Sequence, residues 1–185
     1  MAVEEREKIV ARHEMQCLDL KESRSVDKPY DERSVGAADS GTALAVVALG
    51  SNIEPRAERL ARALDALAAL PGTRLLKASS LLDNAGMDVP PEFAHLRFLN
   101  QVAAFETSLE VRDFARRMHA IEDAQGRVRT GVRNAPRTID LDLIAFGGLV
   151  LDEPDLTIPH PRARERAFVT GPLAEILPDF AWPKC

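Results

Sequence analysis

The chain has 185 residues, room for about one domain with a tail, and its hydrophobic fraction of 45% and charged fraction of 29% are typical of a globular protein. A net charge of −5 argues against a protein that wraps nucleic acid through general positive charge. The longest apolar runs are too short to cross a bilayer, the N-terminal residues lack the apolar stretch of a secretory signal, and the 2 cysteines lie near opposite ends, so we expect a cytoplasmic protein without a membrane span or a disulfide framework.

Residues 1–42 differ in character from the rest of the chain. They carry ten acidic and seven basic residues, and their apolar residues are scattered without a clear period. We interpret this segment as a polar N-terminal extension, flexible for most of its length, with a short helix near residues 3–19. A helix that binds a partner or a membrane surface is the alternative. The globular domain then spans residues 43–185.

The apolar pattern of residues 43–185 predicts four strands and two helices. In chain order we expect a strand at 44–49, a helix between Pro55 and Pro71, a strand at 74–82, an irregular stretch at 83–97, a strand at 98–106, a helix that ends at Gly126, and a strand at 138–146. This order predicts an α+β protein with a ferredoxin-like βαββαβ core, helices packed on an antiparallel sheet, and C-terminal additions. Such a fold hosts many functions, so function has to be argued from particular residues.

Two aspartates stand two residues apart in the last predicted strand. Strand alternation puts Ile139, Leu141, Leu143 and Ala145 on one face and Asp140, Asp142, Ile144 and Phe146 on the other. The two carboxylates would lie roughly 7 Å apart by strand rise and repel each other. Mg²⁺ would relieve this repulsion, since it prefers oxygen ligands and often arrives with substrate phosphates. The alternative is a solvated pair on a half-exposed strand.

An arginine-rich segment leads directly into that strand. Residues 126–137 read GRVRTGVRNAPR, with four arginines (Arg127, Arg129, Arg133 and Arg137) and no acid. Arginine forks match phosphate oxygens and stabilise charge that moves between phosphates. A solvated basic loop, or one that binds nucleic acid, is the alternative reading of the segment alone. Together with the aspartates, however, it supplies the parts of a site for a Mg²⁺-nucleotide.

Three further features carry weaker signals. His160 stands between two prolines and is followed by arginines, so a phosphate contact and a surface turn are both open. Asn100 is a polar amide inside an apolar strand and needs partners, which a ligand or the protein could supply. Gly50-Ser51-Asn52 is not a phosphate-binding loop, because no Gly-Lys-Ser/Thr follows, and we interpret it as an ordinary turn between strand and helix.

Taken together, these segments resemble a known family. ALGSN at 48–52, FLNQVA at 98–103, IEDAQGRVR at 121–129, RNAPRTIDLDLIAFG at 133–147, TIPHPRARERAF at 157–168 and PLAEILP at 172–178 occur in this order. They closely resemble the 6-hydroxymethyl-7,8-dihydropterin pyrophosphokinases of folate biosynthesis, over residues 44 to about 183. The resemblance implies transfer of pyrophosphate from ATP to the hydroxymethyl group of the pterin, with release of AMP.

The resemblance also implies roles for individual residues. Asp140 and Asp142 would hold two Mg²⁺ ions, and Arg127 and Arg137 would contact the phosphates during catalysis, with Arg127 on a mobile loop that acts late. The further residues implied to contact ATP are His119, Glu122, Arg129, His160 and Arg166, and those implied to contact the pterin are Asn100, Phe98 and Phe168. The implied ligands are small molecules, with no nucleic acid and no membrane, and we expect a monomer.

The chain departs from the family pattern in the pterin pocket. An aromatic residue often stands before the Pro-Arg-Thr stretch, where this chain has Asn134, and the loop at 83–91 is a few residues longer than the usual T-x-P-x-G segment. The altered loop motivates a second reading, an enzyme of the same kind that acts on a modified pterin. A third reading is a ferredoxin-like module that binds RNA or an acidic partner.

Overall fold

The computed structural model describes residues 41–87, 89–129 and 135–183, so the predicted extension at 1–42 lies outside the described residues except for its last two positions. The elements in chain order are β1 (Ala43–Ser51), α2 (Arg56–Ala68), β2 (Thr73–Ala78), β3 (Leu82–Ala85), β4 (Arg97–Thr107), α3 (Val111–Ala124), β5 (Asp140–Phe146), β6 (Leu151–Glu153), β7 (Leu156–Ile158) and α4 (Ala167–Ile176). Short 3₁₀ turns lie at Pro91–Phe93 and Ala163–Glu165. The predicted helices and the first, third and last predicted strands are therefore present, within a few residues of their expected bounds.

An antiparallel sheet with the strand order β2-β4-β1-β5 forms the centre of the fold. β3 pairs with the N-terminal half of β4, and β2 pairs with its C-terminal half. The hairpin of β6 and β7 forms a second, two-stranded sheet. Every described pairing is antiparallel, which agrees with the predicted class of sheet.

The second predicted strand, at 74–82, is wrong in one respect, because the chain forms two strands there instead of one. Between them, residues 79–81 face only residues 101 and 102 of β4, so one extra residue interrupts the ladder. Ser79 bridges the break, since its N–H donates to the carbonyl of Val102 (2.9 Å) and its hydroxyl accepts from the N–H of Val102 (3.0 Å). The sheet thus resumes as β3, inside the stretch that was predicted to be irregular.

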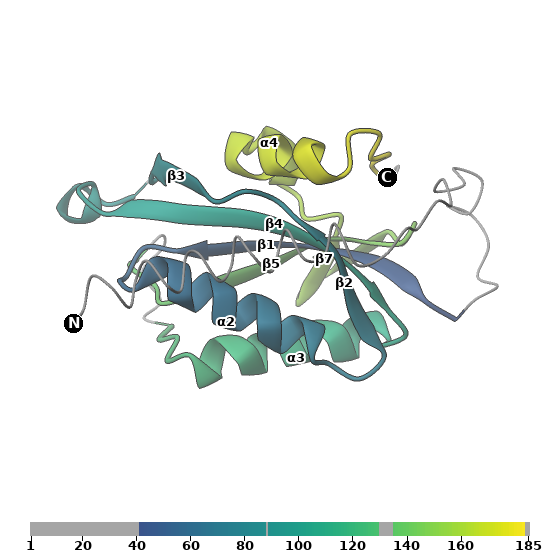
Figure 1. Ribbon diagram of the computed structural model, residues 1–185. Coiled ribbons are helices and arrows are strands. Elements are labelled where there is room, and N and C mark those ends of the chain that lie inside the picture. Colours follow the sequence, from purple (N-terminus) through teal and green to yellow (C-terminus); the bar gives the residue numbers. More distant parts are fainter. Residues whose placement is uncertain (1–40, 88, 130–134, 184–185) are drawn as a thin grey trace, which may run out of the picture. The chain divides into compact units, whose positions relative to one another are not determined.

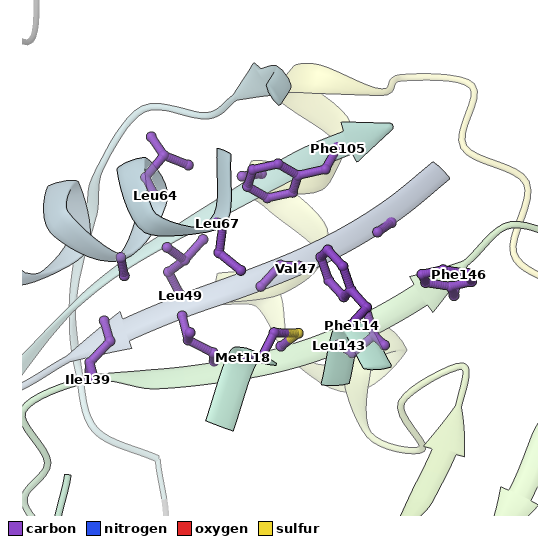
Figure 2. Packing of buried hydrophobic residues seen from close by; sticks show 14 of the residues in the cluster. Val47, Leu49, Leu64, Leu67, Phe105, Phe114, Met118, Ile139, Leu143 and Phe146 are labelled. Carbon is purple, nitrogen blue, oxygen red and sulfur yellow. The ribbon is translucent and has the colours of Figure 1, made fainter. Parts of the chain in front are cut away.

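Helices α2 and α3 cover one face of the sheet (Figure 1). Each helix has an apolar stripe at helical spacing, since Leu60, Leu64 and Leu67 of α2 and Phe114 and Met118 of α3 are buried. Their side chains meet those of the sheet strands in one core (Figure 2). Spacing of three and four residues places each stripe on one side of its helix, which is why both helices lie flat on the sheet.

The C-terminal helix α4 packs on the opposite face of the sheet, as Figure 1 shows. Val169, Leu173 and Ile176 of α4 meet Val46 and Val102 of the sheet in a second buried cluster. The predicted C-terminal additions therefore complete the fold by covering a face that α2 and α3 leave open. None of the helices in the described part of the chain is long and apolar enough to cross a bilayer.

The alternation predicted for the last strand holds only as far as Ile144. The pairing of β5 with β1 shifts by one residue at that point, because Val47 faces Leu143 whereas Val46 faces Ala145. Phe146 consequently lies in the core under α2 and α3, and Ala145 lies on the α4 side, which reverses the expected faces of both residues. A bulge adds one residue, and one residue is enough to exchange the two faces of a strand.

Candidate active site

A cavity of about 350 Å³ opens on the α4 side of the sheet, beside the N-terminus of that helix. Its floor is Gly50 of β1, whose cross-strand neighbours are Asn100 of β4 and Asp140 of β5. A Cβ on Gly50 would lie 2.9 Å from Oδ1 of Asn100. The missing side chain therefore leaves room for Asn100 and keeps a flat strip of backbone between an amide and a carboxylate.

Three arginines surround the predicted pair of aspartates. Nη1 of Arg127 lies 2.8 Å from Oδ1 of Asp140, and Nη1 of Arg137 lies 3.2 Å from its Oδ2. Nη1 of Arg166 lies 3.3 Å from Oδ2 of Asp142. The structure thus brings the acidic pair together with arginines from two distant parts of the sequence. Asp140 pairs with two arginines, one at each carboxylate oxygen, whereas Asp142 pairs with one.

The charges of this group perturb one another. Burial, together with the like charge of Asp140, raises the pKa of Asp142 above its ordinary value, although His160, Arg166 and Arg137 oppose that shift. Burial lowers the pKa of His160. The negative charge of Asp142 raises this pKa, whereas the positive charges of Arg166 and Arg162 lower it further. His160 is therefore neutral at pH 7. Its Nδ1 accepts from the N–H of Arg162 (3.2 Å), so Nε2 carries the proton.

The carboxylate pair fits Mg²⁺ only as part of a larger ligand set. Among the residues that the structure describes, no group of three or more His, Cys, Asp or Glu side chains is gathered closely enough to bind a metal. Asp140 and Asp142 line the cavity on one strand and share one face of it. Mg²⁺ keeps waters and takes one or two carboxylates plus substrate phosphates, so two aspartates at the mouth of a cavity suit it.

Two aromatic rings line the same cavity, each with an arginine over it. Cζ of Arg137 lies 5.3 Å from the centroid of Phe98, and Cζ of Arg166 lies 5.6 Å from that of Phe168. The predicted pterin residues, Asn100, Phe98 and Phe168, are thus all present at the first cavity. A flat ring system with polar edges is the kind of ligand that such a lining can bind.

Asn84 is a cavity residue that sequence reasoning missed. It lines the cavity from β3, and its Oδ1 accepts a hydrogen bond from Nδ2 of Asn100 (2.5 Å). This bond fixes the amide of Asn100 with its oxygen toward Gly50. Asn84 could have been found only by predicting that residues 82–85 pair with β4. The sequence of residues 83–97 has no strand pattern, so it predicts no such pairing.

A second cavity of about 280 Å³ adjoins the first. It lies between α3, β5 and the β6–β7 hairpin, and His119 lines it together with Met118, Leu156 and Thr157. Asp142 and His160 line both cavities. Two ligands, one in each cavity, would therefore approach each other at these two side chains.

Three other predicted site residues do not line either cavity, namely Glu122, Arg127 and Arg129. Glu122 is 3% exposed, and its carboxylate accepts from the N–H of Leu141 (2.9 Å) and from Arg129 (2.6 Å). Arg129 also pairs with Asp123, and Arg127 donates to the carbonyl of Ile139 (2.6 Å) as well as to Asp140. These contacts tie the start of the arginine segment to α3 and β5. The predictions that involve Arg133 and Asn134 lie outside the described residues.

Comparisons with known proteins identify similar sequences. The family model described as 7,8-dihydro-6-hydroxymethylpterin-pyrophosphokinase (HPPK) matches residues 46–178. A 2-amino-4-hydroxy-6-hydroxymethyldihydropteridine pyrophosphokinase from Pseudomonas aeruginosa is 45% identical over 139 residues, which cover 74% of this chain and 82% of that protein. The enzyme of the same name from Methylorubrum extorquens is 42% identical over 137 residues, or 73% of this chain and 83% of the relative.

Solved structures show a similar fold. A crystal structure of wild-type Plasmodium falciparum HPPK-DHPS with pteroate matches with a TM-score of 0.55 over 76% of this chain and 40% of that one. Its sequence identity is 14%, so this likeness concerns the fold alone.

Proposed function

The chain belongs to the 7,8-dihydro-6-hydroxymethylpterin-pyrophosphokinase family and is a pyrophosphokinase of folate biosynthesis, and from this we propose where its substrates bind. The two substrates would meet where the two cavities adjoin, at Asp142 and His160. The reaction joins the hydroxymethyl oxygen of the pterin to the β-phosphorus of ATP and breaks the bond to the α-phosphate, so AMP leaves. The contact between the cavities is the observation that carries this proposal, since the reacting oxygen and phosphorus must come within bonding reach of each other.

The pterin would occupy the first cavity. Phe98 and Phe168 offer ring faces, and Asn100 offers an amide oxygen that Asn84 orients over the backbone of Gly50. An acceptor oxygen in a buried place selects a ligand edge that carries N–H donors, as the pterin ring does. The hydroxymethyl group would then extend from the ring toward Asp142.

ATP would occupy the second cavity with its triphosphate directed toward the first. Asp140 and Asp142 would hold the two Mg²⁺ ions together with phosphate oxygens of ATP and water. Bound there, the ions supply positive charge that neutralises the phosphates. They would also relieve the repulsion between the two carboxylates, which adds to burial in raising the pKa of Asp142.

The chain's own cations would complete the phosphate site. Arg137 and Arg166 line the first cavity beside the aspartates, and Nε2–H of the neutral His160 is free to donate to a phosphate oxygen. Arg127 pairs with Asp140 and would act on charge that develops during transfer. Such fixed donors lower the barrier by stabilising the transition state, with little covalent chemistry for the protein to perform.

Two finer points of the fold and assembly belong to the same proposal. The order β5-β1-β4-β2, with a helix after the first and third of these strands in the chain, supports a ferredoxin-like core. Catalysis by a monomer is also part of this proposal.

Incubation of the full chain with Mg-ATP and 6-hydroxymethyl-7,8-dihydropterin, followed by phosphorus NMR of the nucleotides, tests this function. We expect AMP and a pterin pyrophosphate in equal amounts, and ADP as the sole nucleotide product would contradict the proposal. A panel of pterins with altered side chains, run at matched concentrations, addresses the reading as an enzyme for a modified pterin. A higher kcat/KM for one of those pterins would favour that reading.

A further inference from the structure

Ser51 and Asn52, the residues that the sequence assigned to an ordinary turn, are buried polar residues at the end of β1. Their exposed fractions are 0% and 5%. The pairing of β1 with β5 stops one residue earlier, where Gly50 faces Asp140. The chain that leads into the acidic strand is therefore not held by the sheet itself, and its backbone groups need other partners.

Ser51 and Asn52 supply those partners. The N–H of Arg137 donates to Oδ1 of Asn52 (2.7 Å), and the N–H of Asn52 donates to the carbonyl of Arg137 (3.3 Å). The hydroxyl of Ser51 donates to the carbonyl of Thr138 (2.7 Å). Asn52 thus binds both backbone polar groups of Arg137, and Ser51 binds the next residue.

The same four residues also hold unpaired buried polar atoms. Among the described residues, four buried side-chain atoms have no hydrogen-bond partner in the protein: Nδ2 of Asn52, Nε of Arg137 and Oγ1 of Thr138 in this group, and Nε of Arg59 elsewhere. Native proteins retain few such atoms, because each one costs free energy. The carbonyl of Thr138 and both backbone polar groups of Arg137 are held only through Ser51 and Asn52 in the described part of the chain.

We propose that Ser51 and Asn52 are positioning residues of the pyrophosphoryl transfer, which fix the backbone of Arg137 so that its guanidinium faces the substrate cavity. The guanidinium lies between Oδ2 of Asp140 (3.2 Å) and the ring of Phe98 (5.3 Å to the centroid). A small rotation of the backbone at Arg137 would break both contacts. The inference rests on the proposed role of Arg137 toward the triphosphate.

Asn52→Ala in the full chain removes the acceptor for the N–H of Arg137. We expect kcat to fall at least about tenfold, since a misplaced charged group loses much of its effect on the transition state. Asn52→Asp keeps an acceptor oxygen at the same place but replaces Nδ2 with a second oxygen and adds a buried negative charge, so its kcat should fall less than that of Asn52→Ala. Thr107→Val is the matched control, because it also deletes a buried polar side-chain group that holds other segments, here Thr73 (2.7 Å) and the N–H of Leu109 (3.2 Å), and Thr107 lines neither cavity. It should lower the melting temperature and leave kcat unchanged.

A double-mutant cycle tests whether Asn52 acts through Arg137. If it does, Asn52→Ala in an Arg137→Ala background should lower kcat by less than about twofold more. Full multiplication of the two single effects would overturn the proposal, and so would a kcat for Asn52→Ala equal to that of Thr107→Val. Wild-type activity of Arg137→Ala would refute the proposed role of Arg137 itself, and the inference with it. If Asn52→Ala does not fold, Ser51→Ala takes its place in the cycle, and an unchanged kcat there would overturn the proposal.

Discussion

Asp142 lies in a place where a carboxylate is costly to the folded protein. Burial and the like charge of Asp140 both disfavour its ionised form, whereas Arg166 pairs with only one side of it. We expect Asp142→Asn to leave the free energy of unfolding at pH 7 unchanged or higher, because the amide removes the repulsion. Turnover should nevertheless be abolished at saturating Mg²⁺. Urea unfolding and a steady-state assay of the same preparation check both parts, and near-normal turnover would argue against a metal role for this residue.

Arg127 differs from Arg137 in what its side chain contacts. It lines neither cavity and is held by Asp140 and the carbonyl of Ile139, just after the glycine turn at Gly126. We therefore expect Arg127→Ala to lower kcat about a hundredfold, which is about 3 kcal/mol of barrier, and to weaken ATP binding little. Calorimetry with a nonhydrolysable ATP analogue and single-turnover rates separate the two effects. Weaker binding with an unchanged chemical step would make Arg127 a ground-state anchor.

At the scale of the strand, β1 shapes the pterin cavity through the absence of a side chain. Gly50→Ala would place a methyl group 2.9 Å from Oδ1 of Asn100 and push that amide away from the bond with Asn84. We expect the KM for the pterin to rise at least about tenfold while the KM for ATP changes little. Gly171→Ala in α4 is the matched control, since nothing lies within 4 Å of the added methyl group and alanine favours a helix. An unchanged pterin KM for Gly50→Ala would show that the floor of the cavity is elsewhere.

The strand β3 is held beside the cavity by an exposed group of charges. Asp83 pairs with Arg97 and with Arg56 (3.0 Å), and these partners lower the pKa of Asp83. A lowered folded-state pKa means that the charge stabilises the protein above the unfolded pKa of about 3.9, and that this stability is lost as the pH falls through the folded value. Asp83→Asn should therefore lower the free energy of unfolding at pH 7, with a gap to wild type that narrows in acid. Urea melts over this pH range check the sign, and a gap independent of pH would contradict the ion-pair origin.

For the molecule as a whole, the sequence predicted the helices and the chemistry better than the sheet edges. The stripes of α2 and α3 have helical spacing and are long enough to be unambiguous, and the two aspartates next to an arginine segment indicated a phosphate site before any geometry was known. The bulges after Ala78 and Leu143 were not predictable, because a single inserted residue leaves no periodic signal and depends on the partner strand. The sequence also did not predict the role of Asn84 or the hydrogen bonds from Ser51 and Asn52 to the segment at Arg137. Each of these contacts joins segments that are far apart in the chain, and no local pattern indicates it. The cytoplasmic location and the monomeric state remain predictions.

The last prediction concerns how much of the chain the enzyme needs. Within the part of the chain that the structure describes, both buried clusters are built from residues between Ala43 and Trp182, and both cavities are lined by residues from Ala48 onward. The segment before them is polar and without apolar period, so it offers little area to bury. A chain that starts at residue 42 should therefore fold and keep most of the activity, with kcat and both KM values within about threefold of the full chain. Soluble yield, the melting temperature and steady-state kinetics of the two chains, measured side by side, provide the test. Loss of soluble protein would show that residues 1–41 pack on the domain, and loss of activity with an unchanged melting temperature would assign them a part in catalysis.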